Sequence, residues 1–125
     1  NVHWGLFCGA LFLERLLLQP LHENLRFTLD IKQAAQAQED PLKLLWLMGE
    51  RLANVHLCDY TADQSGAVRT ALPFEGRADF ARLKQALLES GYKGPLIYEV
   101  YARDYKDEDA LYENFRRARA FFESE

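Results

Sequence analysis

The sequence has few cysteines and no long hydrophobic run. Its two cysteines, Cys8 and Cys58, have a spacing that fits neither a zinc-binding pair nor a redox CxxC motif, so we expect free thiols in a reducing compartment, the cytoplasm. The longest apolar stretch, Leu11–Leu18, is interrupted by Glu14 and Arg15, whereas a membrane-spanning helix needs about 20 apolar residues. We therefore expect no membrane segment, and no signal segment is recognisable.

The sequence also lacks an excess of positive charge. It has 19 acidic and 15 basic residues and a formal net charge of −4, which provides no basic surface for DNA or RNA. We expect neither nucleic acid nor a membrane as a partner. With 125 residues, 49% of them hydrophobic, the chain is long enough for one core, and we treat residues 1–125 as a single, partial domain.

Three apolar segments have the character of β-strands, and a helix-like segment follows each of them. The expected strands are Leu25–Ile31, Leu52–Cys58 and Pro95–Tyr101, and Asn1–Trp4 has the character of a strand end. Consecutive strand–helix units are typical of a parallel sheet. The sequence therefore predicts an α/β fold.

Helix start and stop signals fit this alternation. Asp40 before Pro41 is a typical helix start, and Asp79 can cap a helix that Gly91 ends. The expected helices are Gly9–Leu21, Pro41–Gly49, Phe80–Ser90 and Lys106–Phe122. One long loop remains, Asp59–Ala78, and a loop of this length in a compact domain is usually functional.

Each expected strand carries an ionisable residue near its carboxyl end: Asp30, His56 and Glu99. Because side chains alternate across a strand, Asp30 and His56 lie on the face opposite Leu29 and Val55. Buried parallel strands are normally apolar throughout, and active sites of parallel α/β folds lie at the carboxyl ends of the strands. We therefore expect the three side chains to converge at one site.

Two carboxylates and one imidazole form a nitrogen–oxygen ligand set that suits manganese, magnesium, zinc or cobalt. Each residue by itself also has an ordinary structural interpretation. Asp30 could be a turn residue, His56 a buried core histidine, and Glu99 an ion-pair partner of Lys32 or Arg103. However, all three residues lie on the same face of their strands and at the same depth, near the carboxyl ends. This agreement favours the metal site over the three separate interpretations.

With these residues the chain resembles the xylose-isomerase-like TIM barrels. This superfamily contains sugar-phosphate isomerases and epimerases, ketose 3-epimerases, hydroxypyruvate isomerases and apurinic-site endonucleases. The resemblance covers essentially the whole chain and rests on Asn1–Trp4, Leu29–Ala34, Arg51–Asp59 and Pro95–Val100, with Phe74–Phe80 similar to the family's glycine-rich turn. It implies the C-terminal half of a (β/α)8 barrel, from the end of the fifth strand to the eighth helix.

The resemblance also implies roles for individual residues. Asp30 and His56 would be metal ligands at the ends of the sixth and seventh strands, with Asp59 completing a His-x-x-Asp pattern in the second layer around the metal. Glu99 matches the eighth-strand glutamate, which is a ligand and one of two glutamates that act as acid and base. The other glutamate, the fourth ligand, would directly precede Asn1.

The implied activity is a sugar or sugar-phosphate isomerase or epimerase of carbohydrate metabolism that uses one divalent metal ion and proceeds through an enediolate. A small sugar or polyol would be the substrate. By position alone, four residues are expected to face it: His3, Trp4, Lys32 and Gln33. Because the fourth ligand is missing, we expect the chain by itself to be inactive and the full-length protein to be the enzyme.

Two alternatives remain open. The nuclease branch of the superfamily uses three zinc ions, and its second histidine and its Asp-x-His motif are replaced here by Gln33 and Val68–Thr70, which disfavours a nuclease. The other alternative is a non-catalytic half-barrel or binding module. A full barrel takes about 250 residues, so a half-barrel leaves two unpaired sheet edges. We expect a homo-oligomer, in which two halves could close one barrel.

Overall fold

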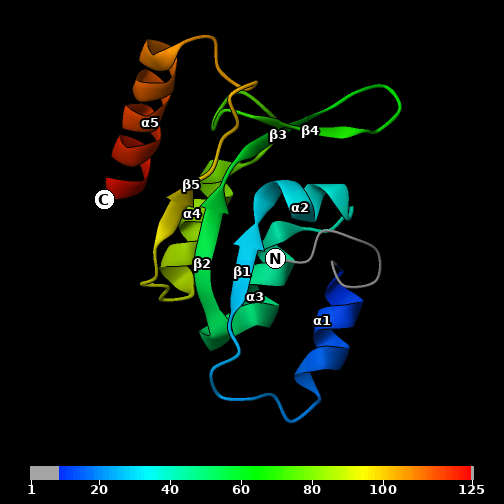
Figure 1. The fold of residues 1–125 in the computed structure, drawn as a ribbon. Coiled ribbons are helices and arrows are strands. Elements are labelled where there is room, and N and C mark those ends of the chain that lie inside the picture. The colour runs from blue at the N-terminus through cyan, green and yellow to red at the C-terminus, as the bar shows by residue number, and fades with distance from the viewer. Residues whose placement is uncertain (1–8, 125) are drawn as a thin grey trace.

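The computed structural model describes residues 9–124 and contains one parallel sheet, one antiparallel hairpin and helices (Figure 1). The sheet has the strand order β1-β2-β5 and consists of β1 (Phe27–Asp30), β2 (Leu52–Leu57) and β5 (Leu96–Tyr98). The hairpin is formed by β3 (Asp59–Ala62) and β4 (Val68–Ala71). The helices are α1 (Ala10–Leu17), α2 (Ile31–Gln36), α3 (Pro41–Met48), α4 (Phe80–Glu89) and α5 (Glu108–Glu123), with a 3₁₀ turn, η2 (Gly49–Arg51).

Parallel pairing within the sheet confirms the predicted α/β fold. Asp30 on β1 is paired with His56 on β2, and His56 is paired with Ile97 on β5. The backbone N–H of Glu99 donates to the carbonyl of Leu57 at 3.1 Å, so the pairing continues one residue beyond β5. This register brings the carboxyl ends of the three strands to one edge of the sheet.

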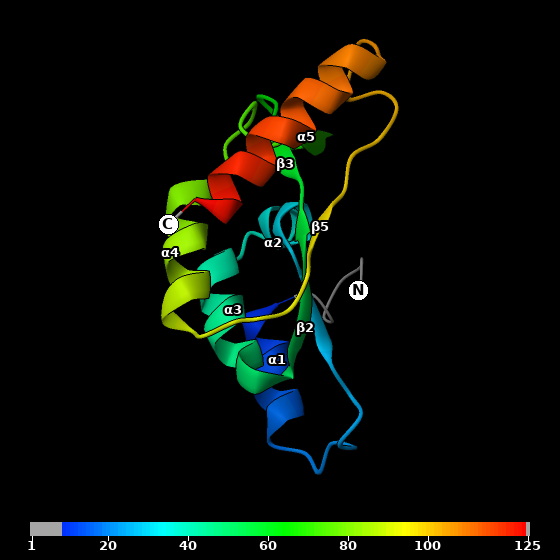
Figure 2. The ribbon, with the colours of Figure 1, turned by 90° about the vertical axis from the view of Figure 1, so that its left-hand side faces the viewer.

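Within residues 9–124, the helices of Figure 2 that pack on the sheet lie on one of its faces. In Figure 2, α1, α3 and α4 all lie on the same side of the strands. Leu29, Val55 and Leu57 are buried on this side, whereas Ile97 on the opposite face is 40% exposed. This is the arrangement of a barrel wall, with helices on its outer face, and it agrees with the predicted half-barrel.

The predicted start and stop signals of α4 are confirmed. The Asp79 carboxylate accepts the backbone N–H of Arg82, and Gly91, at φ +69°, lies just beyond the end of the helix. The side chains that α4 buries recur at helical spacing: Phe80, Leu83, Ala86 and Leu87.

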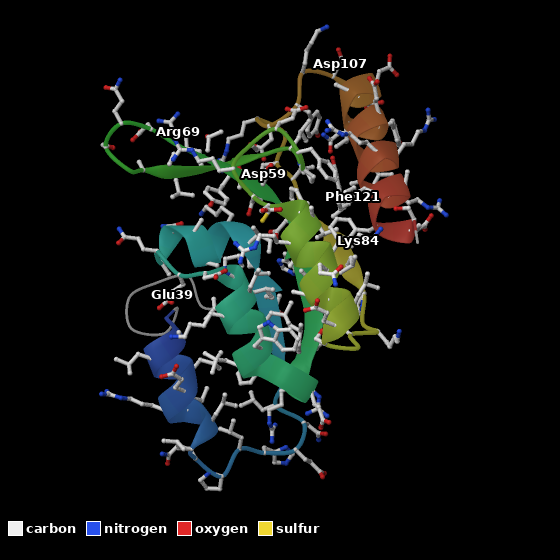
Figure 3. The ribbon with its side chains drawn as sticks, turned by 180° about the vertical axis from the view of Figure 1, so that it is seen from behind. Glu39, Asp59, Arg69, Lys84, Asp107 and Phe121 are labelled. Carbon is white, nitrogen blue, oxygen red and sulfur yellow. The ribbon has the colours of Figure 1, made fainter. Side chains whose placement is uncertain are left out.

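Lys84 of α4 forms hydrogen bonds with the C-terminal end of α5. Its Nζ donates to the carbonyl oxygens of Phe121 at 2.9 Å and Ser124 at 2.6 Å, at the C-terminal end of α5 (Figure 3). The Ser124 hydroxyl also donates to the Phe121 carbonyl, and the positive charge of Lys84 at this end suits the helix dipole.

Two helix boundaries differ from the prediction for local chemical reasons. Helix α1 ends at Leu17 and not at Leu21, because Pro20 disfavours helical geometry in the residue before it. Helix α5 begins at Glu108 and not at Lys106, because Asp107 takes the capping position and accepts the N–H of Ala110.

The segment Asp59–Ala78 was expected to be a loop, and it contains the hairpin β3–β4 instead. Tyr60 pairs with Thr70, and the connecting turn is closed by Asp63, whose carboxylate accepts backbone N–H groups within the turn. The prediction failed because each strand has only four residues, too few to show a clear alternation of polar and apolar side chains. None of the helices described here is long and apolar enough to cross a membrane.

Candidate metal centre

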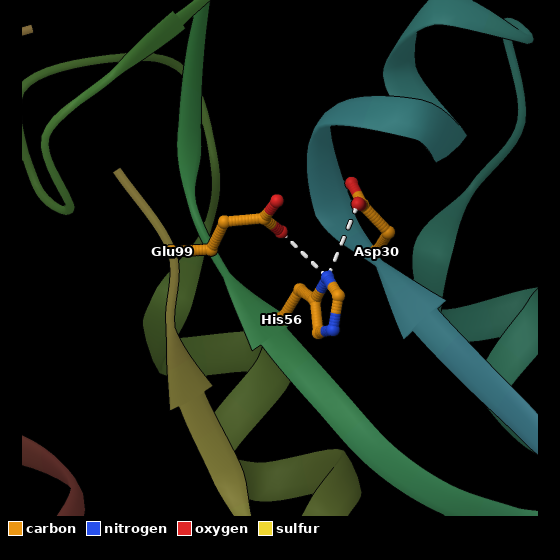
Figure 4. A group of neighbouring side chains, drawn as sticks. All are labelled: Asp30, His56 and Glu99. Atoms are coloured by element: carbon orange, nitrogen blue, oxygen red, sulfur yellow. Dashed lines mark ion pairs between the residues drawn. The ribbon is translucent and has the colours of Figure 1, made fainter. Parts of the chain in front are cut away.

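Asp30, His56 and Glu99 meet at the carboxyl edge of the sheet (Figure 4). Asp30 is the last residue of β1, His56 lies on β2, and Glu99 follows β5 directly. Nδ1 of His56 is 2.5 Å from Oε2 of Glu99 and 3.5 Å from Oδ2 of Asp30. One ligand atom from each residue lies within 4.8 Å of the others. The structure thus brings together the three side chains that the alternation along the strands predicted to converge.

Two atoms of this trio are buried without a hydrogen bond. Among the described residues, neither Nδ1 of His56 nor Oε2 of Glu99 has a hydrogen-bond partner. The two atoms are 2.5 Å apart, but not in hydrogen-bond geometry. A buried polar atom without a partner costs about 1–3 kcal/mol, so such atoms usually mark a missing water, ion or ligand. Both atoms are metal-ligand atoms, and a divalent cation fits them.

Asp30 is held by the start of the helix that follows it. Its Oδ1 accepts the backbone N–H of Gln33 at 2.8 Å, so Asp30 is the N-cap of α2. Sγ of Cys58 lies 3.6 Å from the same oxygen. The strand passes into the helix without a loop, which fixes the carboxylate at the end of β1.

Cys58 is a free thiol that is buried behind the trio. Burial and the nearby negative charge of Asp30 raise the pKa of the Cys58 thiol to about 12. At neutral pH the group is therefore an S–H donor and a poor nucleophile.

Glu99 is held from the solvent side by Tyr101. The Tyr101 hydroxyl donates to Oε1 of Glu99 at 3.3 Å, and the negative charge of Glu99, together with burial, raises the pKa of Tyr101. The guanidinium of Arg103 lies over the Tyr101 ring at 4.9 Å and beside Asp104. Neither Arg103 nor Lys32 forms an ion pair with Glu99 within residues 9–124, so the ordinary ion-pair interpretation of Glu99 loses its support.

Asp59, the expected second-layer residue, organises the loop before α4 (Figure 3). Its fully buried carboxylate accepts the backbone N–H groups of Tyr60 at 2.7 Å, Gly76 at 2.8 Å and Ala78 at 2.9 Å. No hydrogen bond from Asp59 to His56 occurs in the described part of the chain. A side chain at position 76 would overlap the Tyr60 carbonyl and the Asp59 carboxylate, so glycine is required there.

We predict that Asp59→Asn lowers the free energy of unfolding by about 2–3 kcal/mol, because the amide turns a donor toward backbone N–H groups and leaves at least one buried donor unpaired. Urea denaturation measures the change. Asp63→Asn is the matched control, since Asp63 also accepts backbone N–H groups but is exposed to water. Equal losses in the two variants would contradict this role of Asp59.

The residues expected to face a substrate are only partly described. Lys32 and Gln33 lie on α2, next to Asp30, and Nζ of Lys32 donates to Oε1 of Gln36 at 2.6 Å. His3 and Trp4 lie outside the described residues. The substrate-facing role of all four therefore stays a prediction.

Three residues on the strand faces that carry the trio were given no role by the sequence. Cys58 and Tyr101 hydrogen bond to the carboxylates of the trio, and Oδ1 of Asn54 is buried without a partner among residues 9–124. All three share the strand face of His56 or Glu99. The sequence signal available for these residues was the alternation of side chains along a strand. It predicts that two residues share a face of the strand, but not that their side chains are in contact.

Comparison with known proteins agrees with this geometry. The chain matches the family model described as Xylose isomerase-like TIM barrel over residues 13–122, a range that contains the whole trio. No curated protein sequence matches the chain. The family match covers most of the chain, and the parallel sheet with helices on one face agrees with part of such a barrel. The chain therefore belongs to the xylose isomerase-like TIM barrel family.

Proposed function

We propose that the protein containing this chain is a divalent-metal-dependent isomerase or epimerase that moves a proton on a small sugar, sugar phosphate or polyol. The observation that carries the proposal is the pair of buried ligand atoms without a hydrogen bond, Nδ1 of His56 and Oε2 of Glu99, in a family that contains such enzymes. We also propose a cytoplasmic location, which the free thiol of Cys58 supports.

Asp30, His56 and Glu99 would hold the ion. Two carboxylates and a neutral imidazole carry a charge of −2, which a divalent cation balances, and the set suits manganese, magnesium, cobalt or zinc. A bound ion supplies electrostatic stabilisation of negative charge on a substrate oxygen. The fifth-strand glutamate that the family resemblance implies would complete the ligand set.

Glu99 is the carboxylate of this trio that is able to reach a substrate. Its side chain is 29% exposed, whereas that of Asp30 is only 5% exposed. A general base must come within hydrogen-bond distance of the proton it removes. Glu99 would therefore remove or return the proton next to the sugar carbonyl, and Asp30 would hold the ion.

Solvent deuterium exchange tests this proposal. The intact protein, loaded with manganese, is incubated in D₂O with a panel of small ketoses, aldoses and their phosphates. Loss of one carbon-bound proton signal next to the carbonyl, followed by NMR, is the expected result. A metal-loaded protein that exchanges no proton in any member of the panel would refute an isomerase or epimerase.

The trinuclear nuclease alternative is not favoured. Within residues 9–124, Asp30, His56 and Glu99 form the one cluster of His, Cys, Asp or Glu side chains able to hold a metal. Gln33 and Val68–Thr70 stand where the nuclease branch has further ligands. The net charge of −4 also gives no attraction to a DNA backbone.

A second candidate is a half-barrel that pairs with a second copy of itself. Grooves lie beside both edges of the sheet. The groove next to β1 has a volume of about 290 Å³ and includes Phe12, Leu16 and Phe27, and the groove next to β5 has about 210 Å³ and includes Phe115 and Phe122. Among residues 9–124, β1 and β5 each pair with a strand on one side only, and apolar surface beside such an edge favours association.

We expect the 125-residue chain, produced by itself, to be a dimer, because a second copy would cover both edges. Light scattering coupled to size-exclusion chromatography measures the mass. Leu16→Glu, which places a charge in the groove beside β1, should shift the mass toward the monomer, while Leu88→Glu, at an exposed position of α4, should not. A monomeric wild-type chain would contradict this candidate.

A further inference from the structure

The two carboxylates of the trio are bound in the same way. In Asp30, Oδ1 accepts hydrogen bonds from the Gln33 N–H and Cys58, whereas Oδ2 lies 3.5 Å from Nδ1 of His56. In Glu99, Oε1 accepts the Tyr101 hydroxyl, whereas Oε2 lies 2.5 Å from the same Nδ1. In each carboxylate, therefore, protein donors bind one oxygen and the other oxygen is directed toward His56.

We propose that Tyr101 and Cys58 are positioning residues of the metal centre, which make Glu99 and Asp30 each offer a single oxygen to the ion. This inference rests on the proposed metal-dependent function. A carboxylate can bind a metal through one oxygen or through both, and a donor on the outer oxygen fixes the rotation of the group. Loss of such an outer donor typically weakens metal binding by about 10–100-fold.

The Tyr101 hydroxyl is held in place by its surroundings. The backbone N–H of Tyr101 donates to Oδ2 of Asp104 at 3.0 Å, and the Thr70 hydroxyl of β4 donates to the other oxygen of Asp104 at 2.9 Å. The Arg103 guanidinium covers the Tyr101 ring. These contacts tie the segment after β5 to the hairpin β3–β4, so the hydroxyl reaches Glu99 from a fixed position.

Cys58 reaches Asp30 from the buried side of the site. It is only 2% exposed, and its Sγ is 3.6 Å from Oδ1 of Asp30 and 3.9 Å from the carbonyl of His56. An ionised carboxylate has no proton to donate, so the thiol is the donor in this pair. Because Oδ1 is the oxygen turned away from His56, the sulfur lies behind the ligand and is not a ligand itself.

The test compares manganese affinity of the intact protein across four variants, by competition with a chelator. We expect Tyr101→Phe and Cys58→Ala each to weaken manganese binding by about 10–100-fold. Cys58→Ser, which keeps a donor, should restore most of the loss. Tyr112→Phe is the matched control, because Tyr112 is exposed on α5, away from the trio, and it should leave the affinity unchanged.

The metal-free melting temperature separates positioning from folding. Tyr101→Phe should leave it within a few degrees of wild type, so a loss of affinity in that variant is not a loss of structure. Wild-type affinity in both Tyr101→Phe and Cys58→Ala would overturn the proposal. A cobalt-loaded protein whose sulfur-to-cobalt charge-transfer absorption disappears in Cys58→Ser would also overturn it, since Cys58 would then be a ligand.

The outcomes also separate this inference from the proposed function. If the variants lose affinity but no sugar exchanges a proton, the positioning role stands and the isomerase proposal fails. If the wild-type protein binds manganese and both variants bind it equally well, only the positioning role fails. If the wild-type protein binds no manganese, both are refuted.

Discussion

Glu99→Gln is expected to lower the rate of substrate proton exchange by roughly 10²–10⁴-fold, which is the contribution of a positioned general base. The amide has almost the same shape as the carboxylate but accepts no proton at neutral pH. The rate is measured by NMR in D₂O at saturating manganese, so that weaker metal binding does not limit it. The loss should appear mainly in kcat.

Glu113→Gln is the matched control for this prediction. Glu113 is exposed on α5 and has no ion pair in the described structure, so its replacement removes the same charge without touching the site. Proton exchange at the wild-type rate in Glu99→Gln, with manganese bound, would show that Glu99 is not the base. A rate loss of the same size in Glu113→Gln would show that the effect is a general effect of charge.

Manganese is expected to stabilise the wild-type protein by about 2.7 kcal/mol at a free concentration 100 times its dissociation constant, and EDTA should reverse the effect. His56→Ala should abolish this gain, because it removes the imidazole nitrogen that lies near both carboxylates. Urea denaturation with and without manganese measures the gain for each variant.

The metal-free form of His56→Ala provides a second readout. In the wild type, Nδ1 of His56 lies 2.5 Å from the Glu99 carboxylate and 3.5 Å from the Asp30 carboxylate, so its removal leaves two neighbouring carboxylates without the group between them. The metal-free variant should therefore already be less stable than the wild type, and manganese should not restore the difference. His22→Ala, at an exposed loop histidine, is the control and should keep the full manganese effect. An unchanged manganese effect in His56→Ala would place the ion elsewhere.

Much of the fold could be predicted because its signals are local. The alternation of strands and helices and the N-caps Asp40 and Asp79 lie within a few residues of the structures they specify. The hairpin β3–β4 could not be predicted in this way. Its short strands are stabilised by pairing with each other and by Asp104, which is 34 residues from Thr70 in the chain.

The candidate site, too, could be predicted from the sequence only in part. The sequence by itself determined that Asp30, His56 and Glu99 share one strand face and one depth, because the period of two along a strand is a property of the backbone. Only the tertiary structure decided which atoms meet. Sheet pairing sets Nδ1 of His56 between the two carboxylates, and contacts between distant segments place Cys58 and Tyr101 on their outer oxygens. Such contacts depend on side-chain rotamers and on packing in three dimensions, which no periodicity along the chain encodes.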